Sequence, residues 1–447
     1  MILISCKNEN TRIKTHLIKI DAPFAMPEII TPDFSKCKKI SIEKFGAVQG
    51  DKALTTLAIS KAIDKANKIG GGVVVIPEGE WLTGKIHFKS NVNLHLNEGA
   101  VLIFSDNVND YLPAVHTTWE GLECFNYSPL IYAYECENIA ITGTGKLMAK
   151  MTNWEKWFDS PVSHMQALIR LYYLAAKYSP VEERQMANDS ARMRPQFIQF
   201  NRCKNILVEN VSIENSPFWV VHPYMSENVV IRNVNIKAHG NNNDGVDPEM
   251  SQNVLIENCT FDQGDDAIAV KSGRDQDAWR LNTPSKNIVV RNCTIKNGHQ
   301  LLAIGSELSG GIENIFVDNC IVTDEAVSGL FHILFIKTNE RRGGYVKNIF
   351  VSNIKAGKIK EGILGIDTDV LYQWRDIVPT IERRLTRIEN INLKNIMVQE
   401  VQFISRIQGQ EELFVKDVLL QNVSAVKVHR EELIHQYVEN FTFLKNH

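Results

Sequence analysis

The sequence predicts an all-β fold, a single-stranded parallel β-solenoid, because one short phrase recurs along most of the chain. The phrase alternates apolar and polar residues, which is the periodicity of a β-strand. Successive copies start 23, 25, 34, 27, 34, 42 and 27 residues apart. A period in the twenties with insertions, one strand pattern per repeat and no helix per repeat is typical of a solenoid. The copies start at Asn205, Asn228, Asn253, Asn287, Asn314, Asn348, Asn390 and Asp417, and Asn138 opens a looser one.

The sixth residue of every phrase is asparagine, which suits a column of tight corners. Asparagine tolerates the left-handed backbone conformation, and stacked at about 4.8 Å its amides can hydrogen-bond as a ladder. We expect these side chains to turn inward. The next position predicts an apolar interior column in which three cysteines act as small apolar residues without disulfides among them. The ladder is Asn210, Asn233, Asn258, Asn292, Asn319, Asn353, Asn395 and Asn422, and the column is Val211, Val234, Cys259, Cys293, Cys320, Ile354, Ile396 and Val423.

The N-terminal part is expected to cap the solenoid. Residues 55–68 have apolar side chains on one helical face, with Thr55 or Thr56 as the expected N-cap, and such a helix would cover the open end of the core. Three glycines follow at 70–72 and indicate a helix stop before a strand. The repeat lapses at 106–194, which we interpret as inserted loops flanking a cleft. The aromatic residues of this region are Trp119, Trp154, Trp157, Tyr172 and Tyr173.

The first 38 residues are expected to lie outside the solenoid, which would then be a single domain over 39–447. Leu3-Ile4-Ser5-Cys6 matches the end of a bacterial lipoprotein signal, in which the cysteine becomes the lipid anchor. The basic region and the full apolar stretch of such a signal are missing. Either the start of the chain is clipped or the match is chance, and the segment up to Lys38 has the composition of a linker.

Composition excludes several classes of function. The 447 residues carry 49 Lys and Arg against 52 Asp and Glu, a net charge of −3, so no bulk positive field exists for nucleic acid or an anionic membrane. No run of 18 apolar residues is present, which excludes a membrane-spanning helix. The eight cysteines contain no CxxC pair, which argues against zinc ribbons and thioredoxin-type redox sites.

Acidic clusters occur where the repeats are longest. Asp265 and His299 both lie 12 residues after the start of their repeats, so we expect them to stack one strand spacing apart. Asp266 is one residue further, and Asp244 lies 16 residues into the preceding repeat, an offset that the 240–243 run could absorb. Three carboxylates and one imidazole should therefore converge on one exposed face.

Crowded carboxylates have a chemical use. Two ionised groups about 6 Å apart repel by roughly 3 kcal/mol at an effective dielectric near 20, which could raise one pKa by about two units. One carboxyl then stays protonated while its neighbours are ionised, which is the division that glycoside hydrolysis needs between an acid and a base. A calcium site and solvated turn carboxylates are the alternatives at this stage.

The motifs, taken in order, resemble glycoside hydrolase family 28, the polygalacturonases. This chain reads NNDG, GDD, GH and IK followed by TNERRGG where the family reads NTDG, DD, GHG and RIK. FGAVQGDKALTTLAISKAI and SPFWVVHP also look like that family, so the resemblance runs from about Lys39 to the end. It implies a right-handed parallel β-helix that hydrolyses α-galacturonosyl linkages in pectin with inversion and without a metal or other cofactor.

The resemblance also implies roles for individual residues. Asp265 would be the general acid, Asp244 and Asp266 would activate the attacking water, and His299 would support the acid and the substrate. Lys337 matches the RIK lysine, which binds a substrate carboxylate. Further candidate substrate-binding residues are Asn242, which keeps the first position of NTDG, and Lys271 and Arg274, which follow the acid pair. The only partner implied is a pectic polysaccharide or oligogalacturonide, in the periplasm or outside the cell.

Departures from the family pattern bear on specificity. Phe335 replaces the arginine of RIK, so one carboxylate clamp is missing, and Arg341, Arg342 or His332 are candidates to replace it. The long 106–194 region is similar to exo-acting members, which favours removal of terminal residues. Two rivals are a calcium-dependent pectate or rhamnogalacturonan lyase and a non-catalytic carbohydrate-binding solenoid.

Overall fold

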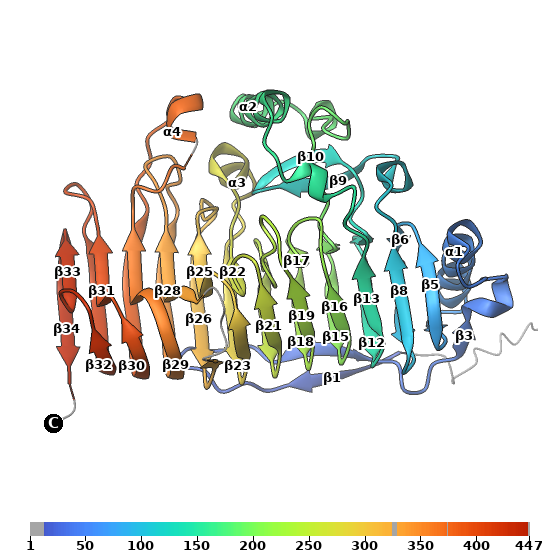
Figure 1. The fold of residues 1–447 in the computed structure, drawn as a ribbon, viewed down its shortest axis with the longest axis horizontal. Coiled ribbons are helices and arrows are strands. Elements are labelled where there is room, and N and C mark those ends of the chain that lie inside the picture. The colour runs from blue at the N-terminus through green and yellow to red at the C-terminus, as the bar shows by residue number, and fades with distance from the viewer. Residues whose placement is uncertain (1–12, 324–328, 373, 446–447) are drawn as a thin grey trace, which may run out of the picture.

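The protein is a right-handed parallel β-helix, seen in a computed structural model that describes residues 13–323, 329–372 and 374–445 (Figure 1). Each coil contributes strands to three rows, and strands within a row pair in parallel with those of the coils before and after. The predicted solenoid is therefore confirmed. Cys6 and the proposed lipid anchor lie outside the described residues. Among those residues, no helix is long and apolar enough to cross a membrane.

The first row follows the recurring phrase and runs the full length of the molecule. Its strands are β3 (Lys39–Ser41), β4 (Gly72–Ile76), β7 (Val92–Leu96), β12 (Glu137–Gly143), β15 (Lys204–Glu209), β18 (Glu227–Arg232), β20 (Gln252–Glu257), β23 (Ser285–Arg291), β26 (Ile312–Asp318), β29 (Tyr345–Asp367), β30 (Arg387–Val401), β32 (Val415–Val428) and β34 (Val438–Leu444).

The second row follows each asparagine corner. It consists of β5 (Gly79–Thr83), β8 (Ala100–Phe104), β13 (Lys146–Ala149), β16 (Ser212–Glu214), β19 (Asn235–Ala238), β21 (Thr260–Gln263), β24 (Thr294–Asn297) and β27 (Ile321–Val322), and β29 continues it because that strand bends through all three rows.

The third row forms the floor beneath the inserted loops. Its strands are β6 (Ile86–His87), β11 (Ile131–Tyr134), β14 (Ile198–Asn201), β17 (Val221–Tyr224), β22 (Ile268–Val270), β25 (Gln300–Gly305), β28 (Leu330–Lys337), the end of β29, β31 (Phe403–Gln408) and β33 (Leu433–Gln436).

Two asparagine ladders, rather than one, stabilise the first corner and the start of each phrase. The predicted ladder forms in part, for example through Asn233 Nδ2 donating to Asn210 Oδ1 at 3.0 Å, whereas Asn353 donates to Asp318 at 2.7 Å; its members have positive φ. Seven of the eight side chains are exposed and Asn422 is half-buried, so the expectation that they turn inward is wrong. The buried ladder is made by the first residue of the phrase, as where Asn228 donates to Asn205 at 3.1 Å and Asn287 to Asn253 at 3.1 Å.

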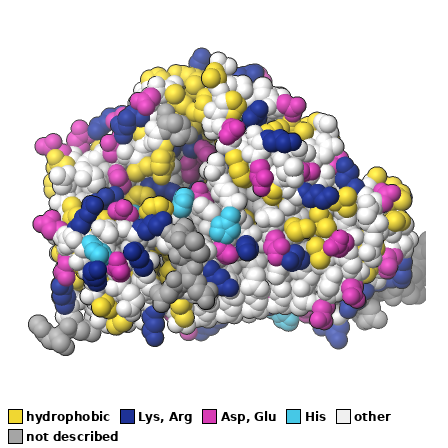
Figure 2. Space-filling model, in the orientation of Figure 1, with side chains coloured by type: hydrophobic (Ala, Val, Ile, Leu, Met, Phe, Trp, Pro, Cys, Tyr) yellow, Lys and Arg dark blue, Asp and Glu magenta, His cyan; other side chains and the backbone are white. Residues whose placement is uncertain are grey.

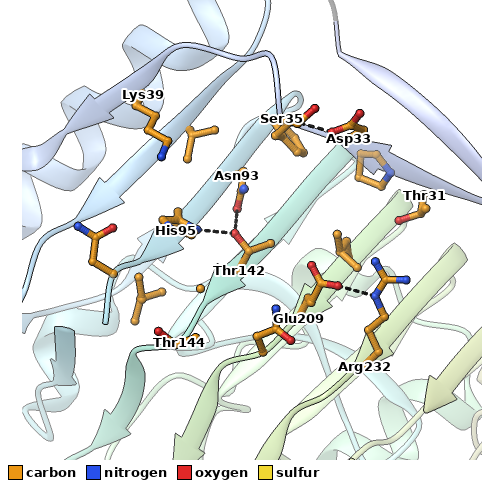
Figure 3. A pocket seen from close by; sticks show the side chains of 18 of the residues that line it. Thr31, Asp33, Ser35, Lys39, Asn93, His95, Thr142, Thr144, Glu209 and Arg232 are labelled. Atoms are coloured by element: carbon orange, nitrogen blue, oxygen red, sulfur yellow. Dashed lines mark hydrogen bonds and ion pairs between the residues drawn. The ribbon is translucent and has the colours of Figure 1, made fainter. Parts of the chain in front are cut away.

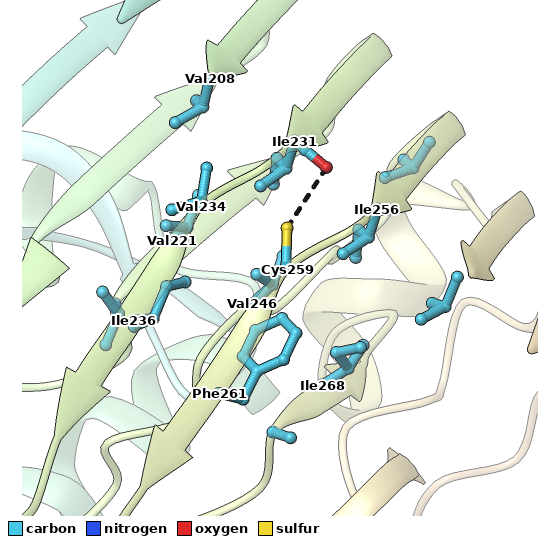
Figure 4. Packing of buried hydrophobic residues seen from close by; sticks show 14 of the residues in the cluster. Val208, Val221, Ile231, Val234, Ile236, Val246, Ile256, Cys259, Phe261 and Ile268 are labelled. Carbon is cyan, nitrogen blue, oxygen red and sulfur yellow. Dashed lines mark hydrogen bonds between the residues drawn. The ribbon is translucent and has the colours of Figure 1, made fainter. Parts of the chain in front are cut away.

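The apolar column after the ladder is buried as predicted. Its eight members are at most 1% exposed, and Cys259, Cys293 and Cys320 are free thiols. Figure 4 shows Cys259 among valine and isoleucine side chains of neighbouring coils, with its thiol directed to the carbonyl oxygen of Ile231 at 3.6 Å. Stacked coils thus bury one continuous apolar core, which fixes the position of each loop that leaves it.

The N-terminal helix covers the first coils, but its start differs from the prediction. Helix α1 (Lys52–Lys68), preceded by η2 (Ile42–Phe45), buries its apolar face against the core. The prediction of Thr55 or Thr56 as N-cap is wrong, because Asp51 accepts a hydrogen bond from the backbone N–H of Leu54 at 2.9 Å. Thr55 instead donates to the Val48 carbonyl, and the helix ends before Gly70, which has φ +87°.

Residues 13–38, expected to be a linker, form an ordered strap along the outside of the first row (Figure 1). Strands β1 (Lys14–Ile18) and β2 (Ile29–Asp33) pair antiparallel, and β2 lies against β12, β15, β18 and β20. The strap buries Ile20, Ile29 and Phe34 against outward-facing residues of those strands. Apolar side chains on the outer face of the first row, such as Leu207 and Val230, thereby lose their contact with water.

The expected insertion at 106–194 is interrupted by a complete coil, β11 to β13. The inserted segments are the antiparallel hairpin β9 (Val115–Trp119) and β10 (Leu122–Asn126), and a second stretch with helix α2 (Val162–Ala176). Short helices η3 (Val108–Tyr111), η4 (Glu155–Trp157) and η5 (Val181–Glu183) complete them, and α3 (Asp275–Leu281) and α4 (Trp374–Ile377) come from later coils. These loops rise above the third row in Figure 1, and the hairpin, α2 and the α4 segment share a small core of their own.

Candidate active site

The predicted site residues converge on one cavity of about 320 Å³ between the third row and the inserted loops. The loops that carry the acidic groups join the second row to the third, where glycines let neighbouring backbones approach. A Cβ on Gly264 would lie 2.7 Å from the backbone nitrogen of Gly240, so only glycine fits there. All eight predicted catalytic or binding residues line the cavity: Asn242, Asp244, Asp265, Asp266, Lys271, Arg274, His299 and Lys337.

Asp265 and His299 stack as the repeat phase predicted. His299 Nδ1 lies 3.0 Å from Asp265 Oδ1, and the backbone N–H of His299 donates to the carbonyl of Asp265 at 2.8 Å. This hydrogen bond raises the pKa of His299. Burial would raise the pKa of Asp265, but the hydrogen bond and charge of His299 outweigh it and hold that pKa below its usual range. The lowered pKa of Asp265 and the raised pKa of His299 favour the proton on His299, which shares it with Asp265 through their hydrogen bond.

Asp266 and Lys337 form the second contact of the site. Lys337 Nζ donates to Asp266 Oδ2 at 3.0 Å, while Asp266 Oδ1 is buried without a hydrogen-bond partner among the described residues. Burial is the main cause that raises the pKa of Asp266, with Lys337 opposing it and the Asp265 charge adding to it. Asp266 Oδ1 is thus an acceptor available for a water or a substrate hydroxyl.

Asp244 is buried in the cavity wall, and the ammonium of Lys271 lies beside it. Lys271 Nζ lies 3.4 Å from Asp244 Oδ2, 3.5 Å from Glu307 Oε2 and 3.7 Å from the buried Asp247. Burial, and then the charge of Asp265, raise the pKa of Asp244 to about 7. The expected rise in one carboxyl pKa is therefore found on Asp244 and Asp266, and not on Asp265, because only Asp265 has a hydrogen-bonded imidazole.

Three predicted substrate-binding residues are held mainly by the protein itself. Lys271 is 5% exposed, and its ammonium lies 4.6 Å from the centre of the Trp219 ring. Arg274 donates to Glu307 at 2.6 Å and to Glu120 at 3.1 Å. Asn242 Oδ1 accepts a hydrogen bond from Arg194 at 2.9 Å. These side chains shape the wall and set its electrostatics, which the sequence pattern did not reveal.

Several wall residues were missed by sequence reasoning. Glu120, at the turn of the β9–β10 hairpin, and Tyr372 and Trp374, near α4, line the cavity from insertions that carry no repeat. In contrast, Trp119, Trp154 and Tyr172, which were expected at a cleft, are buried in packing. Trp119, for instance, stacks on Phe218 with ring centres 4.4 Å apart. Glu120, Tyr372 and Trp374 lie outside every motif in the sequence, so no pattern indicated that they would line the cavity.

The contacts of the acidic cluster test the alternative that it is a calcium site. Asp265, Asp266 and His299 each place one ligand atom within 4.8 Å of the others, which is the spacing of a metal site. However, the Lys337 ammonium already lies against Asp266, and Asp265 is hydrogen-bonded to His299. A divalent cation would have to displace both contacts, so the donor set fits a lysine-balanced acid cluster better than a calcium site.

A larger groove of about 730 Å³ lies on the opposite side, between the strap and the first row (Figure 3). None of the acidic cluster lines it. Its polar groups bond to one another: Thr142 bridges His95 and Asn93, and Arg232 Nε donates to Glu209 at 2.6 Å. We interpret these contacts as structural ladders between coils.

Comparisons with known proteins identify the family. The model of "Glycosyl hydrolases family 28" matches residues 181–435, more than half of the chain. The chain belongs to glycoside hydrolase family 28. It is 35% identical to the crystal structure of a hyperthermoactive exopolygalacturonase from Thermotoga maritima, with a TM-score of 0.83 over 94% of both chains.

Two curated relatives in the family agree with this. A probable polygalacturonase of Vitis vinifera is 29% identical over 386 residues, covering 83% of this chain and 70% of the relative. An exo-poly-alpha-D-galacturonosidase of Dickeya chrysanthemi is 26% identical over 387 residues, covering 81% of this chain and 62% of that protein. As a family 28 member, this protein is a glycosidase.

The position of the missing family arginine is now visible. Phe335 stacks on His332 with ring centres 4.6 Å apart and planes 9° apart. Of the three candidate replacements, Arg342 lines the cavity but donates to Asp275 at 2.6 Å and to the Ser306 carbonyl at 2.6 Å. Arg341 binds carbonyls of the α4 segment, and neither Arg341 nor His332 lines the cavity. None of these three candidates therefore offers an unpaired cation to the cavity.

Proposed function

We propose that this protein is an exo-acting polygalacturonase that removes terminal residues from galacturonan or oligogalacturonides with inversion. The observation that carries the proposal is the convergence of Asp244, Asp265, Asp266 and His299 in one cavity of a family 28 glycosidase. The hairpin β9–β10 and helix α2 rise over the coils N-terminal to the cavity, which is consistent with a closed end. Exo action also agrees with two of the relatives, which are an exopolygalacturonase and an exo-poly-alpha-D-galacturonosidase.

In the proposed mechanism, the surroundings of each carboxyl group decide whether it acts as the acid or activates the water. Asp265 transfers the proton that it shares with His299 to the leaving glycosidic oxygen, as the shared proton can cross their 3.0 Å contact. Asp244 and Asp266 accept hydrogen bonds from the attacking water on the other face of the sugar ring. Lys337, next to Asp266, is placed to hold a substrate carboxylate, as an anionic sugar requires. A pectic polymer is met outside the cytoplasm, so we expect the protein in the periplasm or outside the cell.

Product analysis tests this function. Oligogalacturonides of defined length are incubated with the protein, with and without a chelator, and product size and reducing ends are followed. We expect saturated monomer from the first time point, at a rate that the chelator leaves unchanged. Mixed oligomers would contradict exo action, an unsaturated product that absorbs in the ultraviolet would indicate a lyase, and binding without turnover would indicate a carbohydrate-binding solenoid.

The pH dependence of kcat/KM should be a bell whose acid limb has its midpoint near pH 7. Asp244 must be ionised to activate water, so activity falls as the pH drops through the Asp244 pKa of about 7. The Asp265–His299 pair must hold its proton, so activity is lost as the pH rises through the raised pKa of His299. In His299→Gln the proton rests on Asp265 alone, and the alkaline limb should move to lower pH. A wild-type acid limb with its midpoint near pH 4 would contradict the assignment of Asp244.

A further inference from the structure

Every cation that lines the catalytic cavity is already paired with a carboxylate. Lys271 lies within 3.5 Å of Asp244 and Glu307, and Lys337 lies 3.0 Å from Asp266. Arg274 forms an ion pair with Glu307 at 2.6 Å, and Arg342 forms one with Asp275 at 2.6 Å. The substrate proposed above carries one negative charge per sugar. Lys337 is assigned above to one substrate carboxylate, and the other three cations are buried against carboxylates of the protein, so a further uronate needs a cation from outside the cavity.

The floor of the cavity continues along the third row towards the C-terminal coils. The register places Ala303, Phe335, Gly365 and Arg406 opposite one another on β25, β28, β29 and β31. The residues on either side of Phe335, Leu334 and Ile336, are buried in the core, so this column faces outward. Basic and acidic side chains are interspersed over the face of the molecule seen in Figure 2, and the described residues on that face form no broad basic patch.

Gly365 makes this floor flat. A Cβ at Gly365 would lie 2.8 Å from ring atoms of both His332 and Phe335, so the stacked rings need glycine there. The two rings cover the place that a side chain at Gly365 would take, so they form a flat apolar strip between β28 and Arg406. A flat apolar strip suits the C–H face of a sugar.

Arg406 is the cation at the end of this strip. Its side chain is partly buried, and its guanidinium lies 5.3 Å from the centre of the Phe403 ring. Within the described part of the chain, it has no ion pair and no hydrogen bond from its side chain. Burial, and then the charge of Arg406, lower the pKa of His332 to about 3, which agrees with a guanidinium close to the His332–Phe335 stack.

We propose that Phe335 and Arg406 form a subsite for a uronate residue beyond the cleaved bond, with Arg406 binding its carboxylate. Arg406 lies two strand spacings, about 10 Å, from the strand of Lys337, in the column where the family arginine is replaced by phenylalanine. The planar guanidinium matches a carboxylate in a bidentate contact. This subsite rests on the proposed function and extends it to the recognition of chain length and of free carboxyl groups.

The test compares kcat/KM for trigalacturonate with kcat/KM for digalacturonate. We expect the trimer-to-dimer ratio of Arg406→Gln to fall about tenfold below that of the wild type, because a charge-assisted contact to the longer substrate is lost. Both kcat/KM values are measured with the same preparation, so the concentration of active enzyme cancels in their ratio. Partial misfolding of the variant therefore does not change the ratio. Lys394→Gln removes one exposed positive charge from the first-row strand of the same coil and should leave the ratio unchanged.

A second substrate identifies the bound group. Methyl esterification of the reducing-end residue of the trimer should lower the ratio of the wild type to that of Arg406→Gln, and should not change the variant further. Equal ratios in wild type and Arg406→Gln would overturn the subsite, as would an equal effect of the ester on both. Failure of the proposed function is a separate result, because the wild type would then release no monomer from either oligosaccharide.

Discussion

Asp265→Asn should lower kcat on oligogalacturonides by about 10²- to 10⁴-fold, the usual contribution of a general acid. Asparagine keeps the size of the side chain and can still accept a hydrogen bond from His299, which lies 3.0 Å away. It cannot release a proton to the leaving oxygen. Calorimetry with an oligogalacturonide should show binding within a few-fold of the wild type, so the loss falls on kcat rather than on affinity.

The chain offers a matched control for this substitution. Asp262, three residues earlier, pairs with His239 at 2.7 Å, an aspartate–histidine contact like that of Asp265 but outside the cavity. Asp262→Asn should therefore leave kcat unchanged. An Asp265→Asn variant that keeps more than a tenth of the wild-type kcat would remove Asp265 from the role of acid.

Lys271→Met should lower the free energy of unfolding by about 3–5 kcal/mol at pH 7, the usual cost of leaving buried charges without their partner. Methionine has a similar length, but it leaves Asp244, Asp247 and Glu307 without the ammonium that now lies 3.4 to 3.7 Å from each. Denaturant unfolding measures the change. The same substitution at the exposed Lys394 should cost less than about 0.5 kcal/mol.

The pH dependence separates this electrostatic cause from a packing defect. Without Lys271, the native pKa of the Asp244 and Asp247 carboxyls, already raised by burial, should rise further above the unfolded value. A carboxyl group whose pKa is higher in the native state than in the unfolded state makes the protein less stable as the pH rises. The loss in free energy of unfolding caused by Lys271→Met should therefore be smaller at pH 4 than at pH 7. A deficit that is the same at both pH values would point to packing, and no deficit would show that Lys271 does not balance the cluster.

The repeat phase predicted much of the fold and the centre of the site. Because each coil rises by one strand spacing, equal positions in neighbouring repeats must stack, and Asp265 and His299 do so. The strap was not predicted, because its alternation is short and its partner is the outer face of the first row. Glu120 and Trp374 were missed for a similar reason: they reach the cavity from insertions whose shape depends on contacts far apart in sequence.

The electrostatic division of the site could not be predicted from spacing alone. Spacing brings the carboxyl groups together, but the pKa of each depends on burial and on its own partner. Lys271, expected as a surface or substrate-binding charge, is enclosed by three carboxylates, while Asp265 gains an imidazole. Side-chain depth is a property of the assembled loops, and it decides which carboxyl is protonated.

The anomeric form of the first sugar released tests the central claim most directly. Proton NMR of oligogalacturonide cleavage, recorded from the first seconds and in the presence of a chelator, distinguishes the two anomers before they equilibrate. The arrangement of an acid pair opposite two water-activating carboxylates predicts β-galacturonate from the α-linked substrate, with Asp265→Asn giving no signal above background. Release of the α-anomer, or of an unsaturated sugar, would contradict the account.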